Sequence, residues 1–547
     1  MDPSISEPES TLAPLRIPTF RALWLASIAS NFGGLIQGVG AAWLMTSIAT
    51  SADMVALVQT STTLPIMLFS LMAGAIADGY QRRQVMLIAQ CFMFLVSTGL
   101  ALCAWLDLVT PWVLLSFTFL IGCGIAFNNP AWQAAVGDVV PRDRIAAAVL
   151  LNSVGFNATR SLGPALGGAI VAAAGAAAAF AVNAVSYLGL IGVLWRWRPD
   201  LPSRALPREN LATAMTAGVR YVALTPNIAK VLVRGFAFGS STIVILALLP
   251  LVARGPLEGT ALVYGMLLGT FGIGAVLGAF VSARARQRLT NETLVRWTFL
   301  AIAASAMVLA ESTSAWFSGA ALTIAGGAWV MSLSLFNTTV QMSTPRWVVG
   351  RALSLYQMAI FGGMALGSWL WGTLAESYSV AIALHCAAAA MIVGAGIGLR
   401  LPLPARDTLN LDPLNRWREP QIALDIRPQS GPVAVSVEYQ IEPESVPEFL
   451  AAMSQRHRIR RRDGAHHWTL MRDLEHPRVW VESFEMPTWV DYVRLHMRTT
   501  HADAPVGERI RALHAGSEPP RVSRMLIRDP TRAGDEPAPR EPLDLQQ

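Results

Sequence analysis

One apolar stretch of the chain holds residue types that are costly inside a hydrophobic helix. Residues 157–168 read NATRSLGPALGG, and the residues that stand out are Arg160, Gly163, Pro164, Gly167 and Gly168. A proline removes a helical hydrogen bond, and a charge at membrane depth costs roughly 2.5–3.5 kcal/mol on insertion scales. Glycines let a second helix approach closely. The pattern predicts a helix that repacks during function. Arg160 should face the bundle interior, where it could bind an anionic ligand group, pair with a carboxylate or make a purely structural hydrogen bond.

A second charged cluster lies in the sequence GAIADGYQRRQVM, which contains Gly74, Asp78, Arg82 and Arg83. Gly74 permits close helix packing. A carboxylate at a helix end can pair with an arginine and with a neighbouring helix N-terminus. Such a cluster could act as a latch that holds one conformation and releases it in another. The alternative is a pair of snorkelling charges that only marks the membrane edge.

Amides inside apolar segments are candidate substrate-cavity residues, although amides also serve as interhelical contacts. The candidates are Asn31, Gln37, Asn128, Gln133, Asn157 and Gln357. No metal or cofactor site is expected, because Cys91, Cys103, Cys123 and Cys386 lie in apolar stretches without ligand spacing. No ATP-binding loop of the Gly-x-x-x-x-Gly-Lys-Ser/Thr type is present in the sequence.

The composition indicates the elements that position these residues. The chain has 547 residues, of which 53% are hydrophobic and 14% charged, against roughly 25% charged residues in soluble domains. A spanning helix needs about 20 apolar residues. Twelve such spans are predicted, at 21–48, 54–77, 84–105, 111–134, 145–173, 176–195, 231–252, 260–282, 293–311, 315–337, 351–374 and 378–399.

Arginines follow the even-numbered spans, whereas most other connections carry acidic residues. The arginines in question are Arg82, Arg83, Arg142, Arg144, Arg196, Arg198, Arg204, Arg208, Arg284, Arg286, Arg288, Arg346, Arg400 and Arg406. Basic loops favour the cytoplasmic side, so we expect both termini to be cytoplasmic in a bacterial inner membrane. This topology also explains the net charge of +6 better than nucleic-acid binding does.

The chain repeats itself. FNNPAWQAAVGDVVPRDRIAAA in the first half parallels FNTTVQMSTPRWVVGRALS in the second, and LGPALGGAI parallels LGSWLWGTL. Repeated six-helix halves are a transporter architecture. The predicted organisation is a cytoplasmic tail (1–20), a six-helix half (21–195), a central loop (196–230), a second half (231–400), a linker (401–430), a soluble domain (431–530) and a disordered end (531–547).

The soluble domain is predicted from alternating and helical patterns in the order βαββαβ. Strands are expected at 433–441, 467–475, 478–486 and 521–529, and helices at 444–462 and 488–514. This order gives a ferredoxin-like α+β sandwich. The basic run RHRIRRR (456–462) is expected to touch lipid headgroups. The histidines at 467, 496 and 501 are expected to be packing or surface residues.

These motifs support two family resemblances. The cluster at Gly74 to Arg83 resembles the loop signature of the major facilitator superfamily, with Gln81 in place of its usual glycine. RSLGPALGG resembles the fifth-helix signature of that superfamily's antiporters. Residues 12–405 resemble the transmembrane secretion effector branch, which includes siderophore exporters of the enterobactin type, and FEMPTWVDYVRLHMRTTHAD resembles antibiotic-biosynthesis-monooxygenase domains, which usually dimerise.

The resemblance implies proton-driven export of small amphipathic molecules, siderophore-like or drug-like, by alternating access. The fourth-helix arginine signature of drug–proton antiporters is absent, because that span reads SFTFLIGCGIAFNN. Three alternatives stay open: an importer or facilitator, a fused enzyme–transporter whose soluble domain modifies or senses the substrate, and a membrane sensor without flux.

Overall fold

A computed structural model describes residues 12–141, 144–199, 211–404, 410–414, 416–417, 420 and 422–528. After a short 3-10 helix (Ala13–Arg16), the helices of the first 400 residues are α1 (Pro18–Ile48), α2 (Ala52–Gly79), α3 (Arg82–Trp105), α4 (Pro111–Val139), α5 (Ile145–Arg196), α6 (Leu211–Ala223), α7 (Pro226–Thr242), α8 (Val244–Arg254), α9 (Ala261–Arg288), α10 (Asn291–Glu311), α11 (Ala315–Met342), α12 (Val349–Ser377) and α13 (Val380–Ile397). Within the described residues, eleven helices are long and apolar enough to cross a membrane, with α7 and α8 counted together.

The longest of these helices contains two antiparallel arms. Helix α5 breaks at Gly175, where φ is 78°, a conformation that glycine adopts without strain. Its first arm runs parallel to α1, since Gly155 meets Ile28 and Gly167 meets Ile36. Its second arm runs antiparallel to α1, since Ala179 meets Gly40 and Ser186 meets Gly33. The chain therefore reverses at Gly175, and counting the two arms separately gives the twelve predicted segments.

Local sequence explains where several of these helices begin. Thr110, Thr290 and Ser379 precede α4, α10 and α13, and the side-chain oxygen of each accepts a hydrogen bond from the backbone N–H three residues later. Such N-caps satisfy a donor that the first helical turn leaves without a partner. A proline also occupies the first position of α4, where its missing N–H costs nothing.

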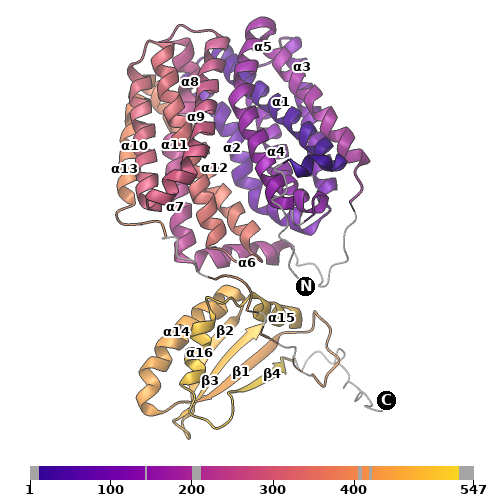
Figure 1. Ribbon diagram of the computed structural model, residues 1–547, viewed down its shortest axis with the longest axis vertical. Helices are drawn as coiled ribbons and strands as arrows, with labels where there is room; N and C mark the ends of the chain where they lie inside the picture. Colours follow the sequence, from indigo (N-terminus) through magenta and orange to yellow (C-terminus); the bar gives the residue numbers. More distant parts are fainter. Residues whose placement is uncertain are drawn as a thin grey trace, which may run out of the picture. The chain divides into compact units, whose positions relative to one another are not determined.

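The spanning helices lie in two groups, which are called the two halves below. Figure 1 shows α1–α5 gathered on one side of the bundle and α8–α13 on the other. Large apolar side chains such as Leu95, Trp105 and Phe280 are exposed on these helices. In a lipid environment such side chains lie against acyl chains rather than water, so their exposure fits a protein that crosses the bilayer.

The chain divides into two compact units. The first comprises residues 1–215, 227–340 and 353–406, and the second comprises 216–226, 341–352 and 407–547. The second unit thus includes two short segments that come between membrane helices in the sequence. Tyr221 and Trp347, one from each segment, pack edge to face with centroids 5.6 Å apart. Arg462 lies over the Tyr221 ring at 5.3 Å and Arg498 over the Trp347 ring at 4.1 Å.

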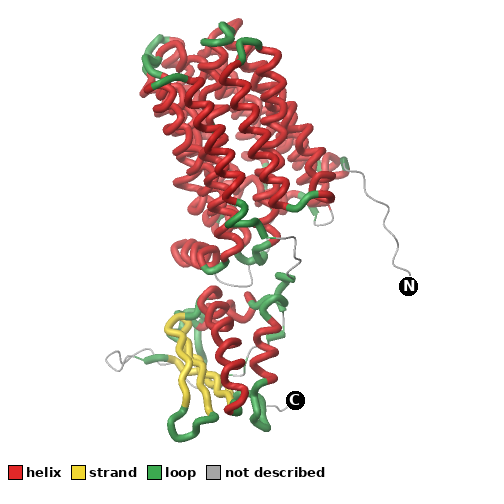
Figure 2. The backbone as a smooth tube through the Cα atoms, turned by 90° about the vertical axis from the view of Figure 1, so that its left-hand side faces the viewer, coloured by secondary structure: helices red, strands yellow, loops and turns green. Residues whose placement is uncertain are grey.

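The soluble part of the second unit is a four-stranded antiparallel sheet with helices on one face (Figure 2). Its elements are β1 (Val433–Gln440), a 3-10 turn (Pro443–Ser445), α14 (Val446–Asp463), β2 (His466–Arg472), β3 (Val479–Met486), α15 (Trp489–Arg498), α16 (Ala504–Ala512) and β4 (Arg521–Leu526). The strand order is β2-β3-β1-β4, with Val435 opposite Phe484. Side chains alternate between buried and half-buried along β1 and β3, so one face of the sheet forms the core.

One predicted helix is wrong in extent. The segment 488–514 was expected to be a single helix, but it forms α15 and α16 with a break between them. Asp503 accepts hydrogen bonds from the Thr500 backbone (3.2 Å) and hydroxyl (2.7 Å). Such local side-chain bonds compete with continued helix, and they reorient the chain before α16.

The core of this unit contains a buried carboxylate. Glu482 lies on the core face of β3 with no exposed surface, and its oxygens accept hydrogen bonds from Arg456 Nε (2.9 Å) and Arg460 Nε (3.3 Å). Trp468 Nε1 and the Tyr439 hydroxyl donate to it as well, each over 3.1 Å. Burial would raise the pKa of Glu482, but the charges of Arg460 and Arg456 and these hydrogen bonds outweigh burial and lower it to about 2.

The basic run of α14 is therefore mostly internal. Three of its five arginines, Arg456, Arg460 and Arg462, form ion pairs with buried carboxylates. The other two, Arg458 and Arg461, are exposed. The expected contact with lipid headgroups concerns only these two and stays a prediction. The correction follows from helical geometry, because residues four apart lie on one helix face.

Replacing Glu482 by glutamine should destabilise this unit strongly. Removing one partner of a buried ion pair costs roughly 3–5 kcal/mol, so the opening free energy of β3 amides in the full-length protein should fall by about that amount. Hydrogen exchange read by mass spectrometry measures it. The control is Glu442→Gln, which removes an exposed pair with Arg478 (3.0 Å) and should cost about 0–1 kcal/mol.

The ion pairs of Glu482 with Arg456 and Arg460 predict that the stability of this unit depends on pH. The pKa of folded Glu482 lies below its ordinary value of 4.5, so its contribution to stability is present above pH 4.5 and is lost as the pH falls toward 2. Protection of β3 should decline in this window in the native protein and not in Glu482→Gln. An identical decline in both proteins would contradict the assignment.

Candidate functional site

The first arm of α5 lies between α1 of its own half and α9 of the other half. On the α1 side, a Cβ added to Gly163 would lie 3.0 Å from Leu35 Cβ, and one on Gly167 would lie 3.0 Å from Ile36 Cα. On the α9 side, a Cβ on Gly168 would lie 2.9 Å from Gly265 Cα. A methyl group at Gly163 or Gly167 would crowd α1, and one at Gly168 would clash with the α9 backbone, so Gly168 places the backbones of the two halves in direct contact.

Pro164 and Gly272 form a matched pair across this contact. Because Pro164 has no N–H, the carbonyl of Arg160, four residues earlier, loses its helical donor. A Cβ on Gly272 of α9 would lie 2.5 Å from that carbonyl oxygen, so the glycine leaves room for it. The backbone at Pro164 stays helical, since within α5 non-helical angles occur only at Gly175.

The Arg160 side chain also reaches the second half. Its Cζ lies 5.7 Å from the centroid of the Phe271 ring on α9, a cation–π distance. Within the described part of the chain, Arg160 makes no ion pair. The structure thus places Gly163 and Gly167 against α1, and Arg160, Pro164 and Gly168 at the contact with α9. Among the described residues, the Arg160 cation at this contact has no carboxylate partner.

Helix α12, the repeat counterpart of the first arm of α5, makes the corresponding contact with α2. The Ser70 hydroxyl of α2 donates to the Ser354 carbonyl of α12 over 3.1 Å, and a Cβ on Gly74 would collide with the Ser354 hydroxyl. Gly367 of α12 instead faces the backbone of Ser240 on α7. The latch residue Gly74 therefore lies where the two halves meet.

The remaining latch residues act within the first half. Arg82 Nη1 pairs with Asp138 of α4 at 2.6 Å and donates to the Ala134 carbonyl at 2.9 Å. Arg83 donates to the carbonyl of Leu194 at the C-terminal end of α5 (2.8 Å), where a cation complements the helix dipole. The structure describes the backbone of Asp78 at the end of α2 but not its side chain. Asp138 is the partner that the sequence alone did not assign.

Two of the six candidate cavity residues are bonded within the first half. Gln37 is buried, and its amide oxygen accepts from the Ser97 hydroxyl (2.8 Å) and from Asn183. Asn128 Oδ1 accepts from Gln90 Nε2 at 3.0 Å. Both amides join helices of one half, so we do not retain them as ligand candidates.

Three other candidates have no side-chain hydrogen bond to any described residue. Asn31 and Gln133 are exposed and Gln357 is half-buried, and none has a hydrogen-bond partner among the described residues. The side chain of Asn157 lies outside the described residues. Asn31 shares an open face of α1 with Gly34 and Gly38, beside which no atom lies within 4 Å of an added Cβ. This face is available to a ligand.

Buried charge in the second half was missed by sequence reasoning. Arg234 of α7 is fully buried, and its Nη1 lies 3.2 Å from Glu292 at the start of α10. The sequence did indicate a buried charge here, because an arginine inside a predicted membrane span is itself unusual. At the other end of the bundle, Arg254 of α8 bonds to Thr46 and Ser47 of α1, which adds a polar contact between the halves.

Comparison with known proteins identifies the family to which the chain belongs. A sequence profile described as transmembrane secretion effector matches residues 9–531. The chain belongs to this family of the major facilitator superfamily. The enterobactin exporter EntS of Salmonella typhimurium is 27% identical over 369 residues, which are 65% of this chain and 86% of the relative. EntS of Shigella flexneri is 26% identical over 367 residues, 65% of this chain and 85% of the relative.

Solved transporters share the fold of the membrane unit. A bacterial homolog of the human lysosomal transporter Spinster matches with a TM-score of 0.53 and 15% identity, over 71% of this chain and 95% of that one. The POT family transporter PepTSo matches with a TM-score of 0.57 and 13% identity, over 70% and 97%. The expectation of a multi-pass, export-type membrane transporter is confirmed.

The family match also extends over the tail. Its profile continues past residue 405 to residue 531, so the soluble region belongs to the sequence of this family. The resemblance to a monooxygenase domain finds no support in the comparisons. The likeness came from one 20-residue stretch around α15, whose pattern of apolar residues is that of an amphipathic helix packed on a sheet.

Gly168→Ala should destabilise the membrane unit, because the methyl group must separate α5 from α9. Overpacking of this kind costs roughly 1–3 kcal/mol, so the Tm of the protein in detergent should fall by several degrees. The matched control is Gly189→Ala on the same helix, where an added Cβ meets nothing within 4 Å. There, alanine should leave the Tm unchanged or raise it. Equal shifts for both variants would contradict the close contact.

Proposed function

We propose that this protein is a proton-coupled exporter of small amphipathic molecules, siderophore-like or drug-like, that works by rocking its two six-helix halves. The observation that carries the proposal is the contact of α5 with α9. There, glycines place the halves backbone to backbone, and Arg160 lies between them with no carboxylate partner in the part of the chain that the structure describes. The enterobactin exporters among its relatives support the direction of transport and the class of substrate.

The chemistry of this contact suits alternating access. Backbone contacts through glycine have no interlocking side chains to disengage, so the helices can slide or separate at small cost. In the structure the Arg160 guanidinium lies 5.7 Å from the centroid of the Phe271 ring. We propose that an anionic group on the substrate takes the place of that ring, because a charge-assisted hydrogen bond is stronger than a half-exposed cation–π contact.

The open face of α1 completes the proposed substrate path. Asn31, Gly34 and Gly38 lie on the helix that also packs against the α5 motif through Leu35 and Ile36. A substrate between the halves would contact an amide and two bare backbone positions on α1. Small-molecule sites typically combine a few polar groups with a mostly apolar wall.

The latch residues fit a separate role. Arg82 and Arg83 join the start of α3 to the C-terminal ends of α4 and α5. We propose that these bonds keep the first half rigid, so that it moves as one body against the second. The distribution of arginines supports an orientation with both termini in the cytoplasm.

Export should depend on both the proton gradient and Arg160. Efflux-deficient bacterial cells that express the protein should accumulate less of a catechol siderophore, or of a dye from a test panel, and a protonophore should abolish the difference. Arg160→Ala should reduce the rate of export by roughly tenfold or more, since a charge-assisted contact is worth about 1.5–3 kcal/mol. Arg160→Lys retains the charge and should keep part of the activity.

Protein amounts in the membrane must be equal across these variants. Export that persists undiminished in Arg160→Ala would contradict the proposed role of this residue. Higher accumulation in expressing cells would instead favour an importer, and unchanged accumulation across the panel would favour a sensor without flux.

A second candidate function concerns the soluble region, which could modify or sense the substrate. A cavity of about 530 Å³ lies under its sheet and is lined by Trp417, Tyr492, His496 and Arg524 among others. His496 stacks on Trp417 with centroids 5.1 Å apart, and burial, with the charges of Arg460 and Arg524, lowers its pKa to about 3. Oxygen uptake by the full-length protein with a quinol-type compound, lost in His496→Ala, would favour an enzyme.

A further inference from the structure

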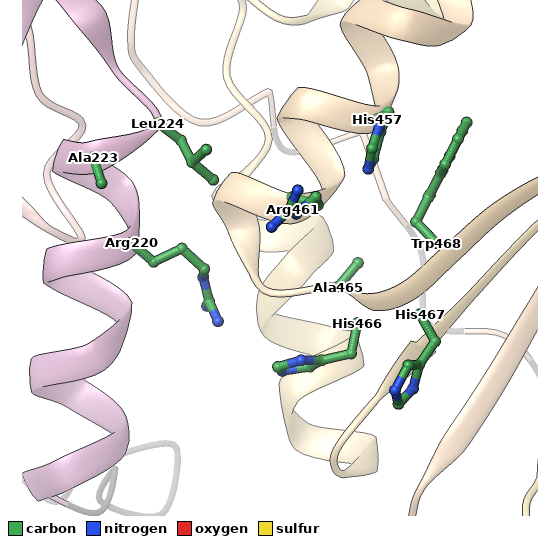
Figure 3. A pocket seen from close by; sticks show the side chains of 9 residues that line it. All are labelled: Arg220, Ala223, Leu224, His457, Arg461, Ala465, His466, His467 and Trp468. Atoms are coloured by element: carbon green, nitrogen blue, oxygen red, sulfur yellow. The ribbon is translucent and has the colours of Figure 1, made fainter.

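A second cavity in the soluble unit, of about 600 Å³, is unusual for the charge of its walls (Figure 3). One wall comes from residues 220–224, which follow the first six membrane segments in the chain. The others come from α14 and the start of β2. All of these residues belong to the second compact unit. The lining residues are Arg220, Ala223, Leu224, His457, Arg461, Ala465, His466, His467 and Trp468.

Two arginines and three histidines line this cavity, and none of the described carboxylates does. Figure 3 shows the side chains of Arg220, Arg461 and His466 turned toward the same space. Arg220 Nε is buried and has no hydrogen-bond partner in the described part of the chain. Arg461 is exposed and makes no ion pair among the described residues. Cationic donors that lack partners and point into one cavity indicate an anion-binding site.

Three carboxylates act on residues that line the cavity, and each already has a partner. Glu485 accepts a bond from the lining residue His467, at Nδ1, over 2.8 Å. Asp463 and Asp491 act on Arg220, but Asp463 is held by Arg462 at 2.9 Å and Asp491 by Arg494 at 3.2 Å. Their charges therefore compensate those of the lining residues only in part.

We propose that this cavity is a binding site for a phosphoryl group, carried either by a small soluble molecule or by a lipid headgroup. The planar guanidinium of arginine matches phosphate oxygens in a bidentate fork, and Arg220 and Arg461 approach from two walls. His457 and Trp468 stack at 4.3 Å with ring planes 13° apart. They form a flat aromatic wall on which the rest of a ligand could lie.

Occupancy would have a structural consequence. Arg220 belongs to a segment between membrane helices in the sequence, whereas Arg461 belongs to the soluble domain. An anion held by both would fasten residues 216–226 to the sheet domain. A bound phosphoryl group would thus act on the connection between the two membrane halves, whatever the exported substrate is.

The histidines make the binding dependent on pH. Burial and the charge of Arg461 lower the pKa of His457. Burial and, to a smaller extent, the charges of Arg220 and His467 lower the pKa of His466. The charges of Glu485 and Asp491 oppose this shift. Both rings are therefore neutral at pH 7 in the empty cavity. A bound anion favours their charged forms, so affinity should rise as the pH falls through and below the ordinary histidine pKa of about 6.5.

Equilibrium dialysis of the full-length protein in neutral detergent against radiolabelled pyrophosphate tests the site. Saturable binding is expected, and Arg461→Gln should weaken it by roughly tenfold, the value of one charge-assisted contact. Arg220→Gln should do the same, and Arg461→Glu should abolish binding. Arg458→Gln is the control, because Arg458 is an exposed arginine of the same helix that does not line the cavity.

Each outcome decides the proposal. Binding that is absent, or that Arg461→Gln and Arg458→Gln weaken equally, would overturn it. Arg461 is exposed, so its loss should leave the fold intact, and an unchanged melting temperature will verify that. Competition by phosphatidylglycerol nanodiscs, but not by phosphatidylcholine ones, would identify a lipid headgroup as the source. No competition, with the arginine dependence retained, would identify a soluble phosphate.

Discussion

The membrane unit depends on one constraint: helices in lipid gain nothing from burying apolar side chains against each other, because lipid is as apolar as they are. Close approach of backbones must supply the attraction. Helix α5 meets this requirement on two faces, with Gly163 and Gly167 toward α1 and Gly168 toward Gly265 of α9. One helix therefore fastens the first half together and forms its contact with the second half.

The same constraint explains why the proline and the arginine lie in this motif. Pro164 releases the Arg160 carbonyl from the helical ladder, and Gly272 allows that carbonyl to approach α9. The Arg160 charge then rests on Phe271 rather than in a permanent ion pair. A contact built from bare backbone and a weakly held cation can be broken and remade. Two interlocked apolar surfaces or a buried salt bridge would resist such motion.

Sequence predicted the membrane segments well, because their composition signal is strong and the repeat supports it. It also placed the five residues of the α5 motif on one helix. It could not show that Gln37 and Asn128 bond within their own half, since an amide in a span is equally compatible with a ligand or with a neighbouring helix. The partner of Arg82, Asp138, lies 56 positions away, and only the fold brings them together. In the soluble domain, Glu482 occupies a core position of β3. The alternation of apolar and polar residues along this strand does not reveal that the partners of Glu482 are arginines of α14.

The central claim is that α5 and α9 move apart during transport, and a reversible cross-link tests it most directly. A Cβ on Gly269 would lie 3.6 Å from Ala165 Cβ, within the range that a disulfide requires. Ala165→Cys with Gly269→Cys, in a chain whose four native cysteines are replaced by serine, should form the bond on oxidation. Export should stop when the pair is oxidised and return when it is reduced, while each single cysteine variant stays active throughout. Full cross-linking with undiminished export would show that the halves do not separate at this contact, and it would contradict the account.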